Sequence, residues 1–394
     1  MSLLSRWKRR LMALWNPPGF QGVFFAIESL HLARAYYVAA ELGIADLLAE
    51  RELSIDELAA ATGSDARALD RILRALAAFG VFAQDRVGRY RLTRRAQVLR
   101  SDVPGSLRAW VRMMARPEMW QAYARSLDAV KSGTPAFQLA HGQHFYDYLG
   151  RHADTREAFF AGLGCWTEWQ SSQLVKAFDF GRYGTIMDVG GGGGSLLSHI
   201  LAAHENLRGI LFDRPETLSL AEARFAAAGL TGRCRTIGGN FLEAIPRGAD
   251  ACIIKNTLCD WNDEGAARLL RNCHAALPPG GTLLWIDAVV DPRSGRDRIV
   301  KMLDLEISAL LPGGMRTQDE LVALAEHCGF GRINIHPTAV VDMQIIEAVK
   351  AAETVPAVVA EPERHAETVV LNVGLLLPDP VALPAATSTA TPLA

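Results

Sequence analysis

The sequence predicts an α/β protein, with a parallel, doubly wound sheet in its second half and a helical region with a short hairpin in its first. From residue 185 onward, short apolar segments alternate with segments of helical periodicity. Five consecutive glycines, residues 190–194, directly follow the first apolar segment. Strands that alternate with helices pair in parallel, and a bare backbone between strand and helix lets a ligand reach main-chain amides. We therefore expect a nucleotide-derived cofactor.

The first region, residues 20–101, has the outline of a winged helix. Three segments carry apolar residues at helical spacing: 42–48, 54–63 and 64–76. Ser54 and Ser64 are the expected N-cap residues, and Gly63 lies between the last two helices. Residues 82–92 are expected to form a hairpin with Gly88 in its turn.

A winged helix allows a DNA-binding interpretation, and the second helix carries three arginines at helical spacing: Arg67, Arg71 and Arg74. We favour a solvated surface, because Asp65 and Asp70 lie beside them and weaken attraction to phosphates. The formal net charge of the chain, −2, also offers no general attraction for nucleic acid.

Residues 103–180 are expected to be helical and are crowded with aromatic and methionine side chains. Most of these are expected in the core, but they exceed what one small core requires, so some should line a pocket for a flat organic substrate. They are Trp110, Met113, Met114, Met119, Trp120, Tyr123, Phe145, Tyr146, Tyr148, Phe159, Phe160, Trp166 and Trp169.

The second half is expected to contain five parallel strands, at residues 185–189, 209–212, 234–237, 251–255 and 282–286. Helices are expected between them, including one over residues 263–277 that ends at a Pro-Pro-Gly-Gly turn. The tail, residues 351–394, is rich in Ala, Val, Pro and Thr without clear periodicity, and we expect it to be flexible.

Composition limits the remaining possibilities. The 394 residues suffice for at least two domains. The six cysteines are scattered, without a CxxC pair or zinc-ligand spacing, so we expect no metal site and reduced thiols in the cytoplasm. The apolar part of the basic N-terminal segment is too short for an export signal, and no apolar run is long enough to span a membrane.

The glycine run does not match the dinucleotide fingerprint G-x-G-x-x-G, because the sixth position is Ser195 or Leu196, depending on the starting glycine. Asp213 lies at the end of the next expected strand, where a carboxylate can accept hydrogen bonds from both hydroxyls of a ribose. That geometry serves NAD and S-adenosylmethionine alike.

The order of several motifs resembles the O-methyltransferase family typified by the plant caffeic acid enzyme, which also includes bacterial natural-product enzymes. The resemblance covers about residues 20 to 350. It rests on residues 188–194, 212–215, 238–241, 255, 260–264 and 277–281. It implies a Rossmann-like methyltransferase sheet, S-adenosylmethionine as cofactor, and a homodimer built by the winged-helix region.

The resemblance also implies roles for single residues. Gly190 and Gly192 would approach the methionine part of the cofactor, and Asp213 would hold its ribose. The adenine would lie beside Asn240 and Phe241, with Lys255 nearby. A sulfonium cofactor needs backbone contacts and a carboxylate rather than a cluster of phosphate-binding cations.

The catalytic positions depart from the family pattern. Cys259 stands where the family has a histidine that takes the substrate proton, Asp287 replaces one flanking glutamate, and Met315 replaces the other. A thiolate facing a sulfonium methyl group risks alkylation, so we expect Cys259 to line the pocket or pack. Asp287 would orient a substrate. Asp260 or a histidine, His141 or His144, would accept a proton.

Three functions remain open at this point, in this order. The first is methyl transfer to a hydroxyl or similarly acidic group of a planar small molecule, driven mainly by positioning. The second is another reaction on the same fold, such as hydroxylation, decarboxylation or cyclisation. The third is a DNA-binding regulator. The expected domains are a dimerisation domain (1–101), a helical linker and substrate-pocket region (102–180), the cofactor domain (181–350) and the tail.

Overall fold

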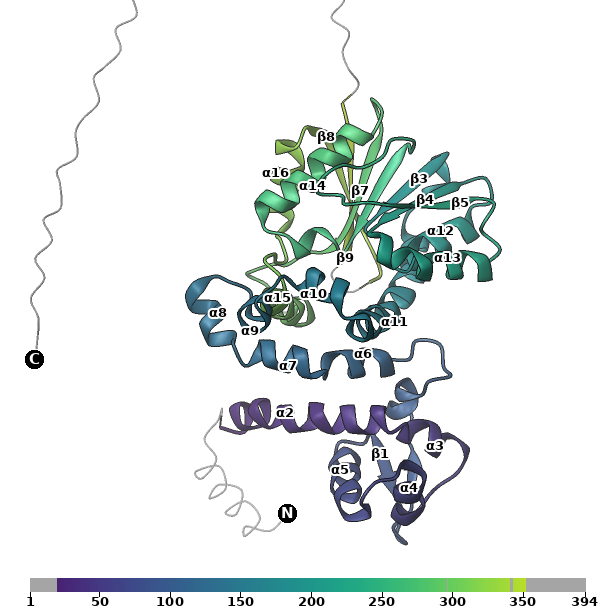
Figure 1. Cartoon of the computed structure of the whole chain (residues 1–394), viewed down its shortest axis with the longest axis vertical. Coiled ribbons are helices and arrows are strands. Elements are labelled where there is room, and N and C mark those ends of the chain that lie inside the picture. The colour runs from purple at the N-terminus through teal and green to yellow at the C-terminus, as the bar shows by residue number, and fades with distance from the viewer. Residues whose placement is uncertain (1–19, 296, 341–342, 352–394) are drawn as a thin grey trace, which may run out of the picture. The chain divides into compact units, whose positions relative to one another are not determined.

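The computed structural model describes residues 20–295, 297–340 and 343–351, which belong to one compact unit (Figure 1). The predictions for the basic N-terminal segment and for the tail beyond residue 351 lie outside these residues. No helix in the described ranges is long and apolar enough to cross a membrane.

The first region contains the expected helices and hairpin. Its elements are α2 (Phe20–Glu41), α3 (Ile44–Glu50), α4 (Ile55–Thr62), α5 (Ala66–Ala78), β1 (Phe82–Gln84), β2 (Tyr90–Leu92) and the 3-10 helix η1 (Arg95–Leu99). β1 and β2 pair antiparallel, and Gly88 has a φ of +87° in their turn. The three arginines of α5 are exposed, and Arg74 pairs with Asp70 at 2.9 Å.

One of the two expected helix caps is wrong. Ser54 caps α4 in a capping box with Glu57, as the sequence predicts. The cap of α5 is Asp65 rather than Ser64: its carboxylate accepts a hydrogen bond from the Ala68 amide at 2.8 Å. The Ser64 hydroxyl instead accepts a hydrogen bond from Thr62 at 2.9 Å, so α5 begins one residue later.

The middle region is helical throughout, as expected. It contains α6 (Arg108–Met114), α7 (Pro117–Tyr123), α8 (Ser126–Ser132), α9 (Ala136–His141), α10 (Phe145–Arg151), α11 (Ala153–Ala177) and the 3-10 helix η2 (Phe180–Arg182). Met113, Met119 and Phe145 are fully buried, which agrees with the expectation that much of this aromatic and methionine content is core.

The second half forms a seven-stranded sheet in the order β5-β4-β3-β6-β7-β9-β8. Its strands are β3 (Thr185–Val189), β4 (Arg208–Asp213), β5 (Cys234–Gly238), β6 (Ala251–Lys255), β7 (Thr282–Ala288), β8 (Phe330–Pro337) and β9 (Met343–Lys350). The first five pair in parallel, as predicted. The last two were not expected, and both β7–β9 and β8–β9 pair antiparallel, so a purely parallel sheet was wrong at this edge.

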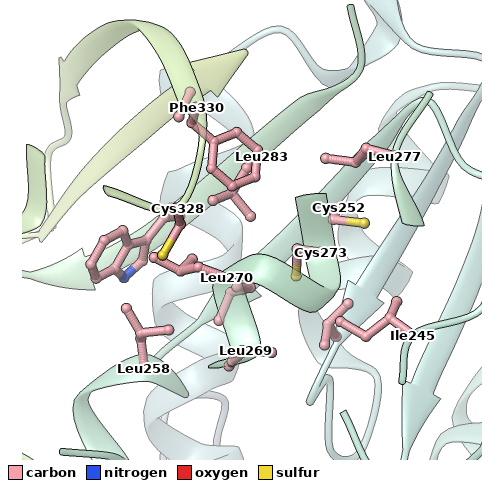
Figure 2. Packing of buried hydrophobic residues seen from close by; sticks show 14 of the residues in the cluster. Ile245, Cys252, Leu258, Leu269, Leu270, Cys273, Leu277, Leu283, Cys328 and Phe330 are labelled. Atoms are coloured by element: carbon pink, nitrogen blue, oxygen red, sulfur yellow. The ribbon is translucent and has the colours of Figure 1, made fainter. Parts of the chain in front are cut away.

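Helices cover both faces of the sheet, which confirms the doubly wound arrangement (Figure 1). They are α12 (Ser195–Ala203), α13 (Leu218–Ala227), α14 (Asp263–Ala276) and α16 (Gln318–His327). α15 (Arg298–Leu310) instead packs mainly against α7 and α9 of the middle region, and the 3-10 helices η3 (Pro215–Thr217) and η4 (Leu258–Asp260) follow β4 and β6. Neighbouring residues of one strand enter different cores: Met187 packs with α14 and α16, whereas Ile186 packs with α12 and α13. Figure 2 shows the first core, where Leu270 and Cys273 of α14 pack near Cys252 and Leu283 of the sheet.

Candidate functional site

A cavity of about 460 Å³ lies at the carboxyl ends of β3, β4 and β6. Loops that follow parallel strands meet at this edge, so it is where such sheets bind ligands. Residues of α6, α10, α11 and α15 close the cavity from the other side. The predicted site residues line it, except Asp287 and the two candidate histidines, His141 and His144.

The glycine loop requires its glycines. Gly190, Gly192 and Gly194 have φ values of +73°, +53° and +73°, a region that other residues rarely adopt. A Cβ on Gly190 would lie 3.0 Å from the side chain of Thr257, and one on Gly194 would lie 2.7 Å from the ring of Phe225. The loop therefore presents bare backbone to the cavity and packs closely behind it.

Asp213 ends β4 and is held by two backbone amides. Its Oδ2 accepts a hydrogen bond from the Gly192 amide at 2.7 Å, and its Oδ1 accepts one from the Arg214 amide at 2.6 Å. Burial raises the pKa of this carboxyl above its ordinary value, while the two amides act in the opposite direction. Each oxygen keeps a lone pair for a ligand, as a pair of ribose hydroxyls requires.

Two further charged groups reach the cavity beside the loop. Burial raises the pKa of Asp188 to about 7, and burial lowers the pKa of Lys255 to about 8. The sequence analysis did not assign Asp188 a role, although it directly precedes Val189 and the glycine run. The cavity therefore offers bare backbone amides, a carboxylate able to bind a ribose, one further acid and one amine. Together these groups fit the amino-acid and nucleoside parts of S-adenosylmethionine.

Asn240 and Phe241 differ in what they offer the cavity. The Asn240 amide is used by its own turn: it donates to Glu243 at 2.9 Å and accepts from the Leu242 amide at 3.0 Å. The ring of Phe241 meets that of Trp261 edge to face, with ring centroids 5.9 Å apart. Phe241 and Trp261 thus form an aromatic wall suited to a planar base.

Cys259 lies in the short turn η4, where its side chain is buried. Burial raises the pKa of the thiol well above its ordinary value, and the nearby Asp287 and Asp260 carboxylates add to this effect. Its sulfur lies 3.8 Å from Oδ1 of Asp260. This shift favours the protonated thiol, as the expectation that Cys259 packs or lines the pocket requires.

Asp287 lies behind the cavity rather than in it. It is 3% exposed, and it accepts hydrogen bonds from the Ala288 amide at 2.9 Å and the Trp285 indole at 3.4 Å. Burial raises its pKa to about 6. Its position allows it to act on Cys259 and Lys255, whose pKa values its charge raises.

Asp260 is paired with a residue that the sequence analysis assigned only to the aromatic group. The Tyr146 hydroxyl, from α10, donates a hydrogen bond to Oδ2 of Asp260 at 2.5 Å, and both residues line the cavity. Burial raises the pKa of Asp260 to about 7, although the Tyr146 hydrogen bond acts in the opposite direction. His141 faces the Glu118 carbonyl at 3.0 Å, and His144 stacks on Trp261; neither lines the cavity.

The turn that carries Cys259 and Asp260 is clamped by the segment after α15. Arg316 donates hydrogen bonds to the carbonyls of Leu258 at 3.2 Å and Trp261 at 2.8 Å. Gly313 lies so close that a Cβ there would be 2.0 Å from the Cys259 carbonyl oxygen. Contacts between segments this far apart in the chain leave no local pattern, so the sequence analysis missed both residues.

A second clamp joins α11 to the glycine loop. Glu168 accepts hydrogen bonds from Ser195 at 2.8 Å and Arg224 at 2.9 Å, and Arg224 also donates to the Gly193 carbonyl at 3.0 Å. Glu168 and Arg224 thereby fix α11 to the glycine loop.

The other half of the cavity is aromatic. The indoles of Trp110 and Trp166 stack with centroids 6.1 Å apart, and those of Trp166 and Trp169 stack at 6.0 Å. Phe159 and Phe160 also line the cavity, and the ring of Phe160 lies near Gly192 of the glycine loop. Among the described residues, no cluster of three His, Cys, Asp or Glu side chains could hold a metal ion.

Two family models match the chain. The O-methyltransferase dimerisation domain matches residues 26–102, and the O-methyltransferase domain matches residues 123–331, more than half of the chain. The chain belongs to the O-methyltransferase family. Members of this family use S-adenosylmethionine as cofactor. The dimerisation domain indicates that this O-methyltransferase is a homodimer.

Named relatives agree with this assignment. A phenazine O-methyltransferase of Lysobacter antibioticus is 38% identical over 82% of this chain and 94% of its own length. The crystal structure of an O-methyltransferase from neocarzinostatin biosynthesis, in complex with S-adenosylmethionine and 2-hydroxy-5-methyl naphthoic acid, is 31% identical, covers 81% of this chain and 96% of its own, and has a TM-score of 0.71. An aclacinomycin 10-hydroxylase of Streptomyces purpurascens is 32% identical over 82% of this chain and 91% of its own length.

Proposed function

We propose that this O-methyltransferase methylates a hydroxyl or similarly acidic group on a planar natural product. One observation carries the proposal: a single cavity joins a glycine loop with a carboxylate at β4 to a wall of stacked indoles. The first end matches an adenosyl cofactor and the second matches a flat aromatic acceptor. The neocarzinostatin relative holds such a pair of ligands.

The cofactor end follows from the chain's own groups. The amides and carbonyls of Gly190 and Gly192 would contact the methionine part, Asp188 would accept from its ammonium group, and Asp213 would accept from the ribose hydroxyls. Phe241 would lie against the adenine, with Asn240 shaping the turn and Lys255 nearby. When bound, S-adenosylmethionine supplies a methyl carbon activated by its sulfonium sulfur.

The chain's contribution to the reaction is mainly positioning. The cavity would hold the acceptor hydroxyl toward the activated methyl carbon, so that the oxygen could gain the methyl group while S-adenosylhomocysteine leaves, and the chain would have to receive the hydroxyl proton. Asp260 would receive that proton through the Tyr146 hydroxyl, which is already hydrogen-bonded to it. Cys259 would fill space beside this pair, and Asp287 would hold Cys259 and the strand end in place.

Each expected region of the chain has its own part in the proposed function. Residues 26–102 match the dimerisation domain, and we propose that residues 102–180 supply most of the aromatic acceptor wall and residues 181–350 the cofactor site. All six cysteines are free thiols, and we propose that the protein acts in the cytoplasm.

The proposal is tested by label transfer and by calorimetry. Purified protein, incubated with methyl-labelled S-adenosylmethionine and a panel of planar phenols, should label one acceptor and release equimolar S-adenosylhomocysteine. Asp213→Asn should weaken S-adenosylhomocysteine binding at least about tenfold, whereas Asp319→Asn on the surface should not. Well-folded protein that shows no binding heat would contradict the proposal.

A second function has one specific observation in its favour, the 32% identity to an aclacinomycin 10-hydroxylase. On that alternative the cofactor binds but its methyl group stays in place. Acceptor turnover without release of S-adenosylhomocysteine would select it.

A further inference from the structure

Glu306 is an acid in the apolar wall of the cavity that the proposed reaction does not use. It lies on α15, and its helix neighbours Leu303, Ile307 and Leu310 line the same cavity. Of the residues that the structure describes, none forms a hydrogen bond or an ion pair with Glu306. Burial alone raises the pKa of this carboxyl to about 7.

An acid in such a place is costly unless something pairs with it. Tyr123 of α7 lies close enough to feel this acid: its pKa is raised mainly by burial and further by the charge of Glu306. The side chain is reached from the cavity rather than sealed away from it. A ligand is therefore in a position to supply the missing donor.

Two of the three cations that line the cavity are paired with acids. Arg214 pairs with Asp147 at 3.3 Å, and Arg224 pairs with Glu168 at 2.9 Å. Lys255 lies near enough to Asp188 for that charge to favour its ammonium form. Among the ion pairs of the described residues, none joins any of these three cations to Glu306.

We propose that Glu306 selects the acceptor: it binds a protonated nitrogen carried by the planar ring, so the preferred substrate class is a phenol or enol with a basic amine substituent. This inference rests on the proposed function and specifies its substrate. A carboxylate pairs more strongly with an ammonium group than with a neutral hydroxyl, because the hydrogen bond is charge-assisted in a poorly solvated wall. An acceptor with a carboxylate at that place would face Glu306 with a like charge.

The test measures binding rather than turnover. The protein, saturated with S-adenosylhomocysteine, is titrated by calorimetry with three naphthols that differ in one substituent: an aminomethyl, a hydroxymethyl or a carboxyl group. We expect the aminomethyl compound to bind at least about tenfold more tightly than the other two. Glu306→Gln should remove this preference, Glu306→Asp should keep part of it, and the matched surface change Glu326→Gln should leave it intact.

The outcomes separate the inference from the function on which it rests. Binding of S-adenosylhomocysteine to each variant reports the folded cofactor site. If it binds and the wild type prefers the carboxyl or the hydroxymethyl compound, or if Glu306→Gln keeps the amine preference, the inference is overturned while the cofactor assignment stands. If S-adenosylhomocysteine does not bind the folded wild type, the proposed function itself fails.

Discussion

Around the η4 turn, burial raises the pKa values of neighbouring residues and thereby sets which of them can accept a proton. Cys259 and Asp260 are adjacent in the chain, and burial raises the pKa of both, but only Asp260 is brought close to neutral pH. The thiol stays protonated because its pKa rises further from neutrality, whereas the pKa of Asp260 rises to about 7. A carboxyl with a pKa near the working pH is the more effective proton acceptor.

The pH dependence of turnover should report Asp260. Its carboxylate form accepts a proton and its acid form does not, so kcat should fall as the pH drops below about 7. Asp260→Asn should lower kcat about a hundredfold and remove that decline. Rate profiles from pH 5.5 to pH 9 (roughly the range that brackets this group) measure both effects.

Cys259→Ala and Tyr146→Phe provide the comparison. The thiol variant should stay within about threefold of the wild type, because a protonated buried thiol takes no part in proton transfer. Tyr146→Phe should lower kcat and shift the pH profile, since it removes the donor to Asp260. If Cys259→Ala lowered kcat as much as Asp260→Asn does, Cys259 rather than Asp260 would be the group that matters for proton transfer.

The sequence and the structure agree best on residues whose neighbours are close in the chain. The glycine run and Asp213 were singled out because they lie at the ends of expected strands, the resemblance supplied the roles of Gly190 and Gly192, and all three residues line the cavity. Tyr146 and Glu306 were not singled out as site residues, because the fold brings them to the cavity from separate helices. Asp287 was placed in the site by resemblance, but it lies one layer behind the cavity wall.

At the scale of elements, four of the five predicted strands (β3, β4, β6 and β7) are apolar runs that are nearly or fully buried, whereas the predicted edge strand β5 is partly exposed. β3 and β7 are nearly or fully buried along their length, and the sequence analysis found both. In β8, exposed residues are interspersed with partly buried ones, as is typical of an edge strand. Its pairing with β9 is also interrupted by a bulge between Gly331 and Ile333. Its weak pattern, followed by the return strand β9, explains why the antiparallel edge was missed.

The loop after α15 packs its backbone directly against the η4 turn, so a small change in this loop should disturb the site. Gly313→Ala would place a Cβ 2.0 Å from the Cys259 carbonyl oxygen and 2.5 Å from the Trp261 amide nitrogen, both of which are backbone atoms. We expect a loss of about 3 kcal/mol or more in the free energy of unfolding, because backbone cannot yield as a side chain does. Chemical denaturation measures the loss.

The matched control is Gly232→Ala, at an exposed turn where a Cβ would meet nothing within 4 Å. That variant should unfold within about 0.5 kcal/mol of the wild type. If Gly313→Ala is equally stable and keeps its acceptor affinity, the loop does not clamp the η4 turn.

For the molecule as a whole, an exposed apolar surface on α2 is the expected contact with the partner subunit. The first half of α2 exposes six large apolar side chains: Phe20, Val23, Phe24, Phe25, Ile27 and Leu30. A contiguous apolar patch of this kind marks an interface. Residues 26–102 match the dimerisation domain, so α2 is the expected contact between the two copies.

Ile27→Glu should therefore separate the dimer. The side chain is 67% exposed in the single chain, so the substitution costs little within one subunit, yet it would bury a charge at the interface. Size-exclusion chromatography with light scattering should show the mass of one chain instead of two. The control is Val87→Glu, at the tip of the β1–β2 hairpin, where the side chain is 80% exposed. That variant should remain a dimer, because no large apolar patch surrounds the hairpin tip in the described structure; dissociation of both variants, or of neither, would place the interface elsewhere.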